Sequence, residues 1–197
     1  MISICMITIK PDTEVQDRID EALSNARGDY EFILVSNPSG GVAKNRNDCL
    51  RQCKGDFVIF IDDDLYGFPE SWDETMIRRL RDPSVLMMGA RLLNIDGSIQ
   101  NTVSKSSNVV DDYVPVEYVP GACMAYRKND LIFNEEYHGW GMEDIEFTMK
   151  LKQANPAGRV YLTNLVRLKH KNEMKREPEF GKRNKELFRR KWGFVIE

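Results

Sequence analysis

The chain has 197 residues, of which 42% are apolar and 30% are charged, and its formal net charge is −3. This length predicts a single domain, over residues 1–197, that buries a full hydrophobic core. The negative net charge excludes non-specific attraction to phosphate backbones as a general mode of binding.

The N-terminal segment and the cysteines indicate the cellular compartment. Residues 1–10 lack the basic start and the small-residue cleavage site of a signal peptide, and they are too short to span a bilayer. The four cysteines lack the spacing of a disulfide framework, and Cys49 and Cys53 lack the further ligands that a zinc site needs. We therefore expect reduced thiols and a cytoplasmic location.

The amino-terminal half alternates strands with helices. Strands are predicted at Ile2–Ile9, Glu31–Ser36 and Phe57–Ile61, and helices at Thr13–Ala26 and Val42–Cys53. This β-α-β-α-β order predicts parallel strands joined by right-handed crossovers. The expected fold class is therefore α/β, with a mainly parallel central sheet flanked by helices.

The carboxyl-terminal half lacks that regular alternation, so we expect it to be mixed. Asp96-Gly97, between two apolar runs, is a hairpin signal, and the segment rich in Ser, Asn and Asp that follows is typical of a mobile loop. The predicted elements are helices at Glu70–Arg81, Glu143–Gln153 and Pro178–Trp192, the loop Lys105–Asp112, and strands at Val85–Leu93, Ser98–Val103, Tyr118–Arg127, Arg159–Tyr161 and Val166–Lys169. The strand Tyr118–Arg127 is expected to be broken by Pro120-Gly121.

Three consecutive aspartates, Asp62, Asp63 and Asp64, follow the apolar run Phe57–Ile61. Such a run is typical of a strand that is buried on both faces. Adjacent carboxylates repel one another, and a bound Mg²⁺ or Mn²⁺ would explain their clustering because these ions take oxygen ligands. Open α/β sheets also bind ligands at the carboxyl ends of their strands. The alternative is a polar turn in which an aspartate caps the next element.

The segment from Arg167 to Lys191 is locally basic, with eleven Lys and Arg residues against four Glu residues. A solvated helical face is the default explanation of such a segment. The other expectation is that its helix contacts a partner, and peripheral contact with a membrane surface is one form of this. The chain has no predicted transmembrane segment.

Five short segments combine glycines with acidic, basic or aromatic residues. They are GGVAKNRN (Gly40–Asn47), GDFVIFIDDD (Gly55–Asp64), PGACMAYRK (Pro120–Lys128), GWGMEDIEF (Gly139–Phe147) and FRRKWG (Phe188–Gly193). With these segments in this order, the chain resembles family 2 glycosyltransferases of the GT-A fold over nearly its whole length. Its Gly-Trp-Gly-x-Glu-Asp stretch is also similar to that of galactosyltransferase-type relatives. The resemblance implies one Rossmann-like GT-A domain, in which residues 1–103 bind the nucleotide sugar and metal and residues 104–197 face the acceptor.

The resemblance also implies a metal site. Asp62–Asp64 would be the DXD element, in which Asp64 coordinates Mn²⁺ or Mg²⁺ and Asp62, with Asp63 beside it, approaches the ribose, the diphosphate or the metal. Many relatives place a further metal-binding histidine late in the chain, and His170 stands there. An isolated histidine is also common as a surface or packed residue, so both interpretations of His170 stay open.

Glu143-Asp144 matches the acidic pair of the family, in which the aspartate is the usual catalytic base. Successive side chains on a helix diverge by about 100°, so only one of the two carboxylates can face an acceptor hydroxyl. We choose Asp144 as the base, with Glu143 orienting the loop or capping the helix. Trp140 would offer its face to a sugar ring or pack in the core. His138 is a weaker candidate for the acceptor side.

The donor-binding residues are less clearly marked. Lys44 and Arg46 follow a Gly-Gly turn at a predicted helix start, which is a place suited to a pyrophosphate, although exposed helix charges are the alternative. The segment after the second predicted strand departs from the family pattern, because it lacks the usual acidic pair that holds the base or ribose. Asn37 could hydrogen-bond a uracil edge instead, and Asp12 could supply the acid.

The expected function is metal-dependent, inverting transfer of a sugar from a nucleoside-diphosphate sugar, with UDP as the expected nucleotide, to an acceptor hydroxyl. The acceptor would be a glycan, a lipid-linked sugar, a protein or a modified nucleic acid. A nucleotidyltransferase is one alternative, but it usually needs a glycine-rich loop where this chain has Lys10–Thr13. A non-catalytic module that binds nucleotide sugars is the other.

Overall fold

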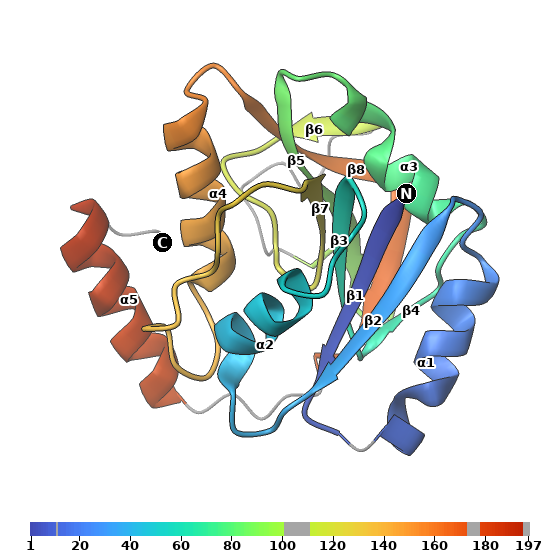
Figure 1. Ribbon diagram of the computed structural model, residues 1–197, viewed down its shortest axis with the longest axis horizontal. Coiled ribbons are helices and arrows are strands. Elements are labelled where there is room, and N and C mark those ends of the chain that lie inside the picture. Colours follow the sequence, from blue (N-terminus) through green and yellow to red (C-terminus); the bar gives the residue numbers. More distant parts are fainter. Residues whose placement is uncertain (11, 101–110, 173–177, 195–197) are drawn as a thin grey trace.

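The computed structural model describes the chain except for residues 11, 101–110, 173–177 and 195–197, and except for the side chains of residues 12–14. The described residues form a single α/β domain around one open, mixed sheet with helices on both faces (Figure 1). The expected fold class is confirmed. No helix within the described ranges is long and apolar enough to cross a bilayer.

In the described part of the chain, the sheet has eight strands in the order β2-β1-β3-β7-β5-β8-β4, with β6 also paired to β8. The strands are β1 (Ile2–Thr8), β2 (Tyr30–Ser36), β3 (Phe57–Asp62), β4 (Leu65–Tyr66), β5 (Val85–Leu93), β6 (Tyr113–Pro115), β7 (Cys123–Arg127) and β8 (Arg159–His170). The helices are α1 (Asp12–Ser24), α2 (Gly41–Leu50), α3 (Trp72–Arg78), α4 (Glu143–Ala154) and α5 (Pro178–Trp192), with a 3₁₀ turn at Arg79–Arg81.

Strands β1, β2 and β3 form the parallel part of the sheet. β1 lies in the middle and pairs in parallel with both neighbours, so that Ile4 stands opposite Phe32 and Ile59. The apolar run of β3 is buried from Val58 to Ile61, as expected for a strand covered on both faces. The predicted β-α-β-α-β order is confirmed. The carboxyl ends of β1 and β3 therefore meet at one edge, where Ile7 stands opposite Asp62.

The rest of the sheet is mixed because β7 runs against both of its neighbours, β3 and β5. β5 then pairs in parallel with β8. Two short strands, β6 and β4, pair antiparallel with different parts of the long strand β8. The mixed character expected of the carboxyl-terminal half is thus confirmed.

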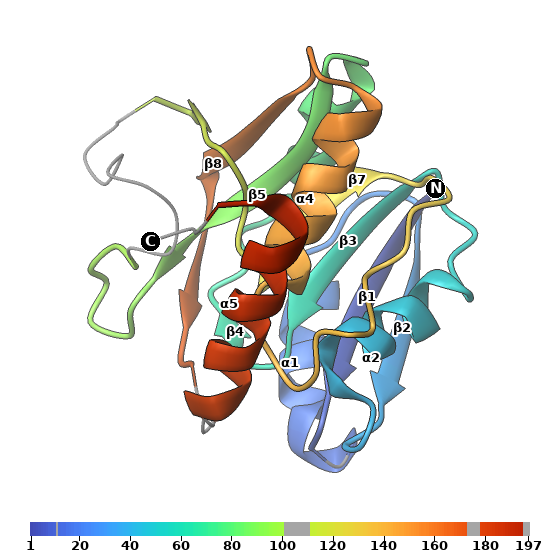
Figure 2. The ribbon, with the colours of Figure 1, turned by 90° about the vertical axis from the view of Figure 1, so that its left-hand side faces the viewer.

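Helices cover both faces of the sheet, with α1 and α3 on one face and α2 and α4 on the other (Figure 1). The first layer contains the fully buried Trp72, whose indole N–H donates to the carbonyl of Ala22 over 2.9 Å and so joins α3 to α1. The second layer contains Phe133 and Phe147, whose rings stack with centroids 4.3 Å apart. Helix α5 lies beside α4 (Figure 2), where Phe188 packs against Tyr137 and Met142.

Four predicted elements differ from the structure. The strand predicted at Tyr118–Arg127 begins only at Cys123, after the expected break at Pro120-Gly121, because proline and glycine are poor strand residues. The two strands predicted at Arg159–Tyr161 and Val166–Lys169 are one strand, β8, which pairs with β5 through register shifts. The helix predicted from Val42 to Cys53 ends at Leu50. The sequence pattern also does not predict β4 and β6, since two or three residues carry no periodicity.

The hairpin signal at Asp96-Gly97 is confirmed, because Leu93 and Ile99 form an antiparallel bridge on either side of it. The rest of the strand predicted at Ser98–Val103 lies mostly outside the described residues. So does most of the predicted loop Lys105–Asp112.

Candidate functional site

A cleft opens at the carboxyl ends of β1 and β3. It has a volume of about 880 Å³ and lies between these strand ends, the start of α2, segment 118–122, the start of α4 and one side of α5. Its polar lining includes Arg46, Asp62, Asp64, Asp144 and His170. This is the place where open α/β sheets bind ligands. The structure thus gathers the predicted metal-binding and catalytic residues in one cavity.

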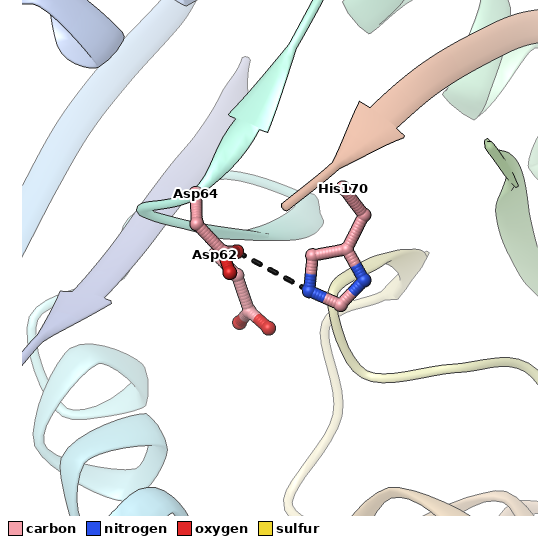
Figure 3. A group of neighbouring side chains, drawn as sticks. All are labelled: Asp62, Asp64 and His170. Carbon is pink, nitrogen blue, oxygen red and sulfur yellow. Dashed lines mark ion pairs between the residues drawn. The ribbon is translucent and has the colours of Figure 1, made fainter. Parts of the chain in front are cut away.

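Asp62, Asp64 and His170 point toward one another in the cleft (Figure 3). One ligand atom from each residue lies within 4.8 Å of the other two. Nε2 of His170 lies 3.2 Å from Oδ1 of Asp64, and both of these side chains are buried. Two carboxylates and an imidazole are ligands that a first-row divalent metal ion accepts. The three predicted metal-binding residues are therefore close enough to share one ion.

The backbone ladder places His170 in this cluster. β4 pairs antiparallel with the end of β8, and Leu65 stands opposite His170. The N–H of Lys171 donates to the carbonyl of Asp64 over 3.1 Å. Asp64 directly precedes β4, so the pairing of two short segments fixes the distance between the aspartate and the histidine.

Gln100 fixes the imidazole ring of His170. Its amide nitrogen donates to the carbonyl of His170 over 3.1 Å, and its amide oxygen lies 3.0 Å from Nδ1 of the ring. A carbonyl only accepts hydrogen bonds, so the amide oxygen is the group left to face Nδ1, and Nδ1 carries the hydrogen. Nε2 is therefore the ring nitrogen that faces Asp64. An outer hydrogen bond of this kind is general in metal-binding histidines.

Asp62 has a perturbed carboxyl group. Partial burial and the neighbouring carboxylates Asp64 and Asp63 raise its pKa to about 6, although Arg46 and His170 oppose the shift. Nη2 of Arg46 lies 3.8 Å from its Oδ1. The cluster therefore has an excess of negative charge, and Asp62 takes up a proton more readily than an isolated aspartate does. A divalent cation would replace that proton and favour the ionised form.

Asp63 also lines the cleft but is held by β1 rather than by the metal cluster. The hydroxyl of Thr8 donates to one of its oxygens, and Nζ of Lys10 lies 3.5 Å from the other. Asp63 is thus held toward β1, whereas Asp62 and Asp64 face His170.

Arg46 is buried, and protein groups hold its guanidinium. Nη1 donates to Oε1 of Glu143 over 2.9 Å, and Nη2 donates to the carbonyl of Gly121 over 3.0 Å. Gly121 leaves the room for this, because a Cβ there would lie 2.4 Å from Nη2. The guanidinium of Arg46, which was predicted to contact a pyrophosphate, is therefore already bonded to protein groups. It bridges α2, segment 118–122 and α4.

The two acidic residues at the start of α4 have different surroundings. Glu143 is buried, and burial together with the nearby Asp144 carboxylate raises its pKa to about 7 against the opposing effect of Arg46. Asp144 is half-buried and lines the cleft. Its carboxylate accepts hydrogen bonds from the N–H of Gly121 over 2.7 Å and from the N–H of Ile145 over 2.8 Å. Both residues line the cleft, but Asp144 is the more exposed and is oriented by two backbone N–H groups, whereas Glu143 is bonded to Arg46.

The loop before α4 forms one wall of the cleft together with α5. Trp140 lines the cleft, and its ring packs over Gly181, where a Cβ would lie 2.9 Å from Cη2. Trp140 thus packs against α5, as one prediction had it, and also borders the cavity, as the prediction of a sugar contact requires. Lys185 lines the cleft from α5, and no carboxylate pairs with it among the described residues. The sequence does not single out Lys185, because it is one of many basic residues in α5.

Four other candidates are not in the described lining of the cleft. Lys44 pairs with Asp48 on the outer side of α2 over 3.1 Å. The side-chain oxygen of Asn37 accepts hydrogen bonds from Ser39, within its own turn. The side chain of His138 is exposed. Asp12 begins α1, but its side chain lies outside the described part of the structure.

Comparison with curated proteins finds similarity to the pre-mycofactocin glycosyltransferase of Mycobacterium tuberculosis, strain CDC 1551 / Oshkosh. The two chains are 26% identical over 160 residues, and strain ATCC 25618 / H37Rv gives the same values. The similar region is 73% of this chain and 33% of the relative. The chain therefore spans about a third of the length of these curated relatives.

Among solved structures, GalNAc-T7 with UDP, GalNAc and Mn²⁺ matches 86% of this chain and 43% of its own, with a TM-score of 0.66 and 10% identity. Residues 1–349 of S. aureus TarS in complex with UDP-GlcNAc match 95% of this chain and 64% of their own, with a TM-score of 0.65 and 17% identity. At these identities the likeness shows the fold alone, which is that of GT-A glycosyltransferases.

The sequence pattern of the family described as Glycosyl transferase family 2 matches residues 11–142, more than half of the chain. The chain therefore belongs to glycosyl transferase family 2, as the resemblance of its motifs implied.

Proposed function

We propose that this chain transfers a sugar from a nucleoside-diphosphate sugar, in the first instance a UDP-sugar, to a hydroxyl group of an acceptor. The observation that carries the proposal is that the Asp62–Asp64–His170 cluster and the oriented carboxylate of Asp144 line the same cleft. Membership of family 2 supports it. So do the two structural neighbours, since one contains UDP, GalNAc and Mn²⁺ and the other contains UDP-GlcNAc.

Asp62, Asp64 and His170 would hold the divalent cation, with Asp62–Asp64 as the DXD element. The hydrogen bond that orients the ring of His170 and the raised pKa of Asp62 both fit such a role. A nitrogen ligand favours Mn²⁺ over Mg²⁺, because Mg²⁺ is satisfied mainly by oxygen. When bound, the ion would supply Lewis-acid neutralisation of the charge that develops on the leaving diphosphate.

Lys185 would contribute a second positive charge to the leaving diphosphate. It faces the cleft from α5 and has no carboxylate partner in the described ranges. Preorganised cations that face a developing negative charge lower the barrier of group transfer. In this arrangement residues 1–103 supply most of the donor-side contacts, and residues 104–197 supply His170, Lys185 and the acceptor side.

Asp144 would act as the general base. Its two backbone hydrogen bonds orient the carboxylate, so that it can accept the proton of an attacking hydroxyl. A base on the face opposite the leaving diphosphate gives inversion at the anomeric carbon. Glu143 is a poorer base, because it is buried and bonded to Arg46. Its role would be to orient the start of α4.

The acceptor would enter past the Gly-Trp-Gly loop, Gly139–Gly141, where Trp140 borders the cleft. A galactosyltransferase-type use of this segment, with a sugar ring against the indole face, belongs to the proposal. The hydroxyl group would come from a glycan, a lipid-linked sugar, a protein or a modified nucleic acid. Peripheral membrane contact through α5 and a cytoplasmic location stay predictions.

Thermal unfolding with and without ligands tests the proposal. Ligands that bind the folded state alone raise the melting temperature. UDP or UDP-GlcNAc together with Mn²⁺ should raise it by several degrees, whereas UDP with EDTA should not. Slow release of UDP from UDP-GlcNAc, with water as the acceptor, should need Mn²⁺. If no nucleoside diphosphate shifts the transition in the presence of Mn²⁺, and no UDP-sugar is hydrolysed, the proposed function is wrong.

A further inference from the structure

The loop that leads into α4 has an unfavourable backbone conformation. Gly139 and Gly141 have φ values of +68° and +92°, and Met142, which is not a glycine, has a φ of +77°. Met142 is also the residue that precedes the first turn of α4, and it makes no side-chain capping hydrogen bond. A non-glycine residue in the left-handed region is strained and persists only where surrounding contacts enforce it. The loop therefore needs support from another element.

Asn184 of α5 provides that support. Its side chain is fully buried. Its amide nitrogen lies within hydrogen-bonding distance of three carbonyl groups of the loop, those of His138 at 2.9 Å, Trp140 at 2.8 Å and Gly141 at 3.1 Å. The amide nitrogen of Asn184 thus holds the carbonyls of His138, Trp140 and Gly141 close together. A buried polar side chain in the middle of an otherwise apolar helix face is expensive unless it is bonded in this way.

The contacts around Asn184 interlock α5 with the same loop. A Cβ on Gly139 would lie 2.7 Å from the ring of Phe180, and a Cβ on Gly181 would lie 2.9 Å from the ring of Trp140. Each glycine thus makes room for an aromatic ring of the other segment. Further along the helix, the fully buried Phe188 packs against Met142. The loop and α5 therefore pack closely against each other, and Asn184 is the polar link between them.

We propose that Asn184 is a positioning residue for the catalytic base: it holds residues 138–142 in the conformation that directs the carboxylate of Asp144 into the cleft. This inference rests on the proposed function, because it takes Asp144 as the base. Asn184 acts through Gly141 and Met142, since these two residues join the bonded carbonyls to the start of α4. The metal cluster is built on β3, β4 and β8, which lie apart from this link.

Two substitutions separate positioning from general stability. Asn184→Ala removes the donor group, and Gly181→Ala instead pushes a methyl group against Trp140 while keeping the amide. Arg183→Ala, at the exposed neighbour of Asn184, is the matched control. For the two test variants, affinity for UDP with Mn²⁺ should stay within about threefold of wild type, while release of UDP from UDP-GlcNAc should fall about 10²-fold, because a small misplacement of a reacting group has that effect. Arg183→Ala should change neither quantity.

The second measurement is a double-mutant cycle on turnover. If Asn184 acts through Asp144, then Asn184→Ala should cause little further loss in an Asp144→Asn background, since the base it positions is already gone. A merely structural role predicts that the two losses multiply. Multiplicative losses, or a loss in donor affinity as large as the loss in turnover, would overturn the proposal.

Amide hydrogen exchange gives a readout that does not need catalysis. Asn184→Ala should speed exchange in peptides that cover residues 137–147 and leave residues 57–62 of β3 unchanged. If no nucleoside diphosphate shifts the thermal transition of wild type and no UDP-sugar is hydrolysed, the proposed function fails, but the exchange result still decides whether Asn184 holds the loop. If Asn184→Ala does not fold, Gly181→Ala carries the same comparison. Unchanged exchange in residues 137–147 for both variants would contradict the inference.

Discussion

Arg46 and Glu143 form a buried ion pair with 2.9 Å between Nη1 and Oε1. The pair joins α2 to the first residue of α4, and both side chains are almost fully excluded from solvent. Burial outweighs the attraction of Arg46, because the pKa of Glu143 is raised from 4.5 to about 7. The folded protein therefore holds the proton of Glu143 more tightly than the unfolded chain does.

This shift gives the stability of the protein a defined dependence on pH. Below pH 4.5, Glu143 is protonated in both states. As the pH rises through 4.5 to about 7, the unfolded chain ionises first, so Glu143 should lower the free energy of unfolding over this window by on the order of 3 kcal/mol. Denaturant unfolding of wild type and Glu143→Gln between pH 5 and pH 8 measures it. The two proteins should be similar near pH 5, and the decline should be smaller in Glu143→Gln. Equal declines would show that Glu143 is not the titrating group.

The metal cluster predicts unequal roles for neighbouring aspartates. Asp64→Asn should abolish the dependence of UDP binding on Mn²⁺, because Asp64 faces His170. Asp63→Asn should have a smaller effect, since Asp63 is bonded to Thr8 and Lys10 instead. Calorimetric titration of UDP into each variant, with Mn²⁺ and with EDTA, separates the two. Loss of metal dependence in Asp63→Asn but not in Asp64→Asn would reverse the assignment.

Gln100 gives a prediction about metal affinity that leaves the metal ligands intact. Gln100→Leu removes the hydrogen bond to Nδ1 of His170, and loss of such an outer partner typically weakens metal binding by about 10–100-fold. Mn²⁺ titration followed by the thermal transition should show the weaker binding. Asn94→Leu, in the same hairpin but bonded to Ser98, is the control. Wild-type Mn²⁺ affinity in Gln100→Leu would mean that His170 does not bind the metal.

The two acidic residues of α4 should differ in their effect on turnover. Asp144→Asn keeps the size of the side chain but cannot accept a proton, so the rate should fall by about 10²–10⁴-fold at saturating donor. Donor affinity should stay near wild type, because the metal cluster of Asp62, Asp64 and His170 does not include a residue of α4. Single-turnover release of UDP from UDP-GlcNAc measures the step. If Glu143→Gln is inactive and Asp144→Asn is active, Glu143 rather than Asp144 is the base.

Much of the fold could be predicted from the sequence, where periodicity is strong. The apolar run of β3 and the helix-strand alternation before it identified the parallel part of the sheet. Local pattern could not show that β7 would insert antiparallel between β3 and β5, because strand pairing depends on contacts between distant segments. It also could not find β4, which has only two residues, although this strand positions His170.

The site was predictable where chemistry is concentrated in few residues. Asp62, Asp64 and Asp144 stand in motifs, and the structure brings all three to the cleft. Gln100 and Asn184 were not predictable, since a single amide residue carries no motif and its meaning comes from a partner far along the chain. The position of Asn184 between Phe180 and Phe188, at helical spacing on a buried face, was the one available signal. Lys44 and Asn37 were predicted from local motifs, but in the structure Lys44 pairs with Asp48 and Asn37 bonds to Ser39.

The pairing of β4 with β8 makes the third metal ligand depend on the last strand of the sheet. Leu65 and His170 are neighbours only in the folded ladder, and a slip of one residue would turn the imidazole to the opposite face. A refolding chain that has formed β1, β2 and β3 already carries both aspartates, yet it has no histidine beside them. Contacts between distant segments form late. The time course of tight Mn²⁺ binding during refolding should therefore follow the pairing of β8 with β4, which makes the ion a reporter of when the sheet is complete.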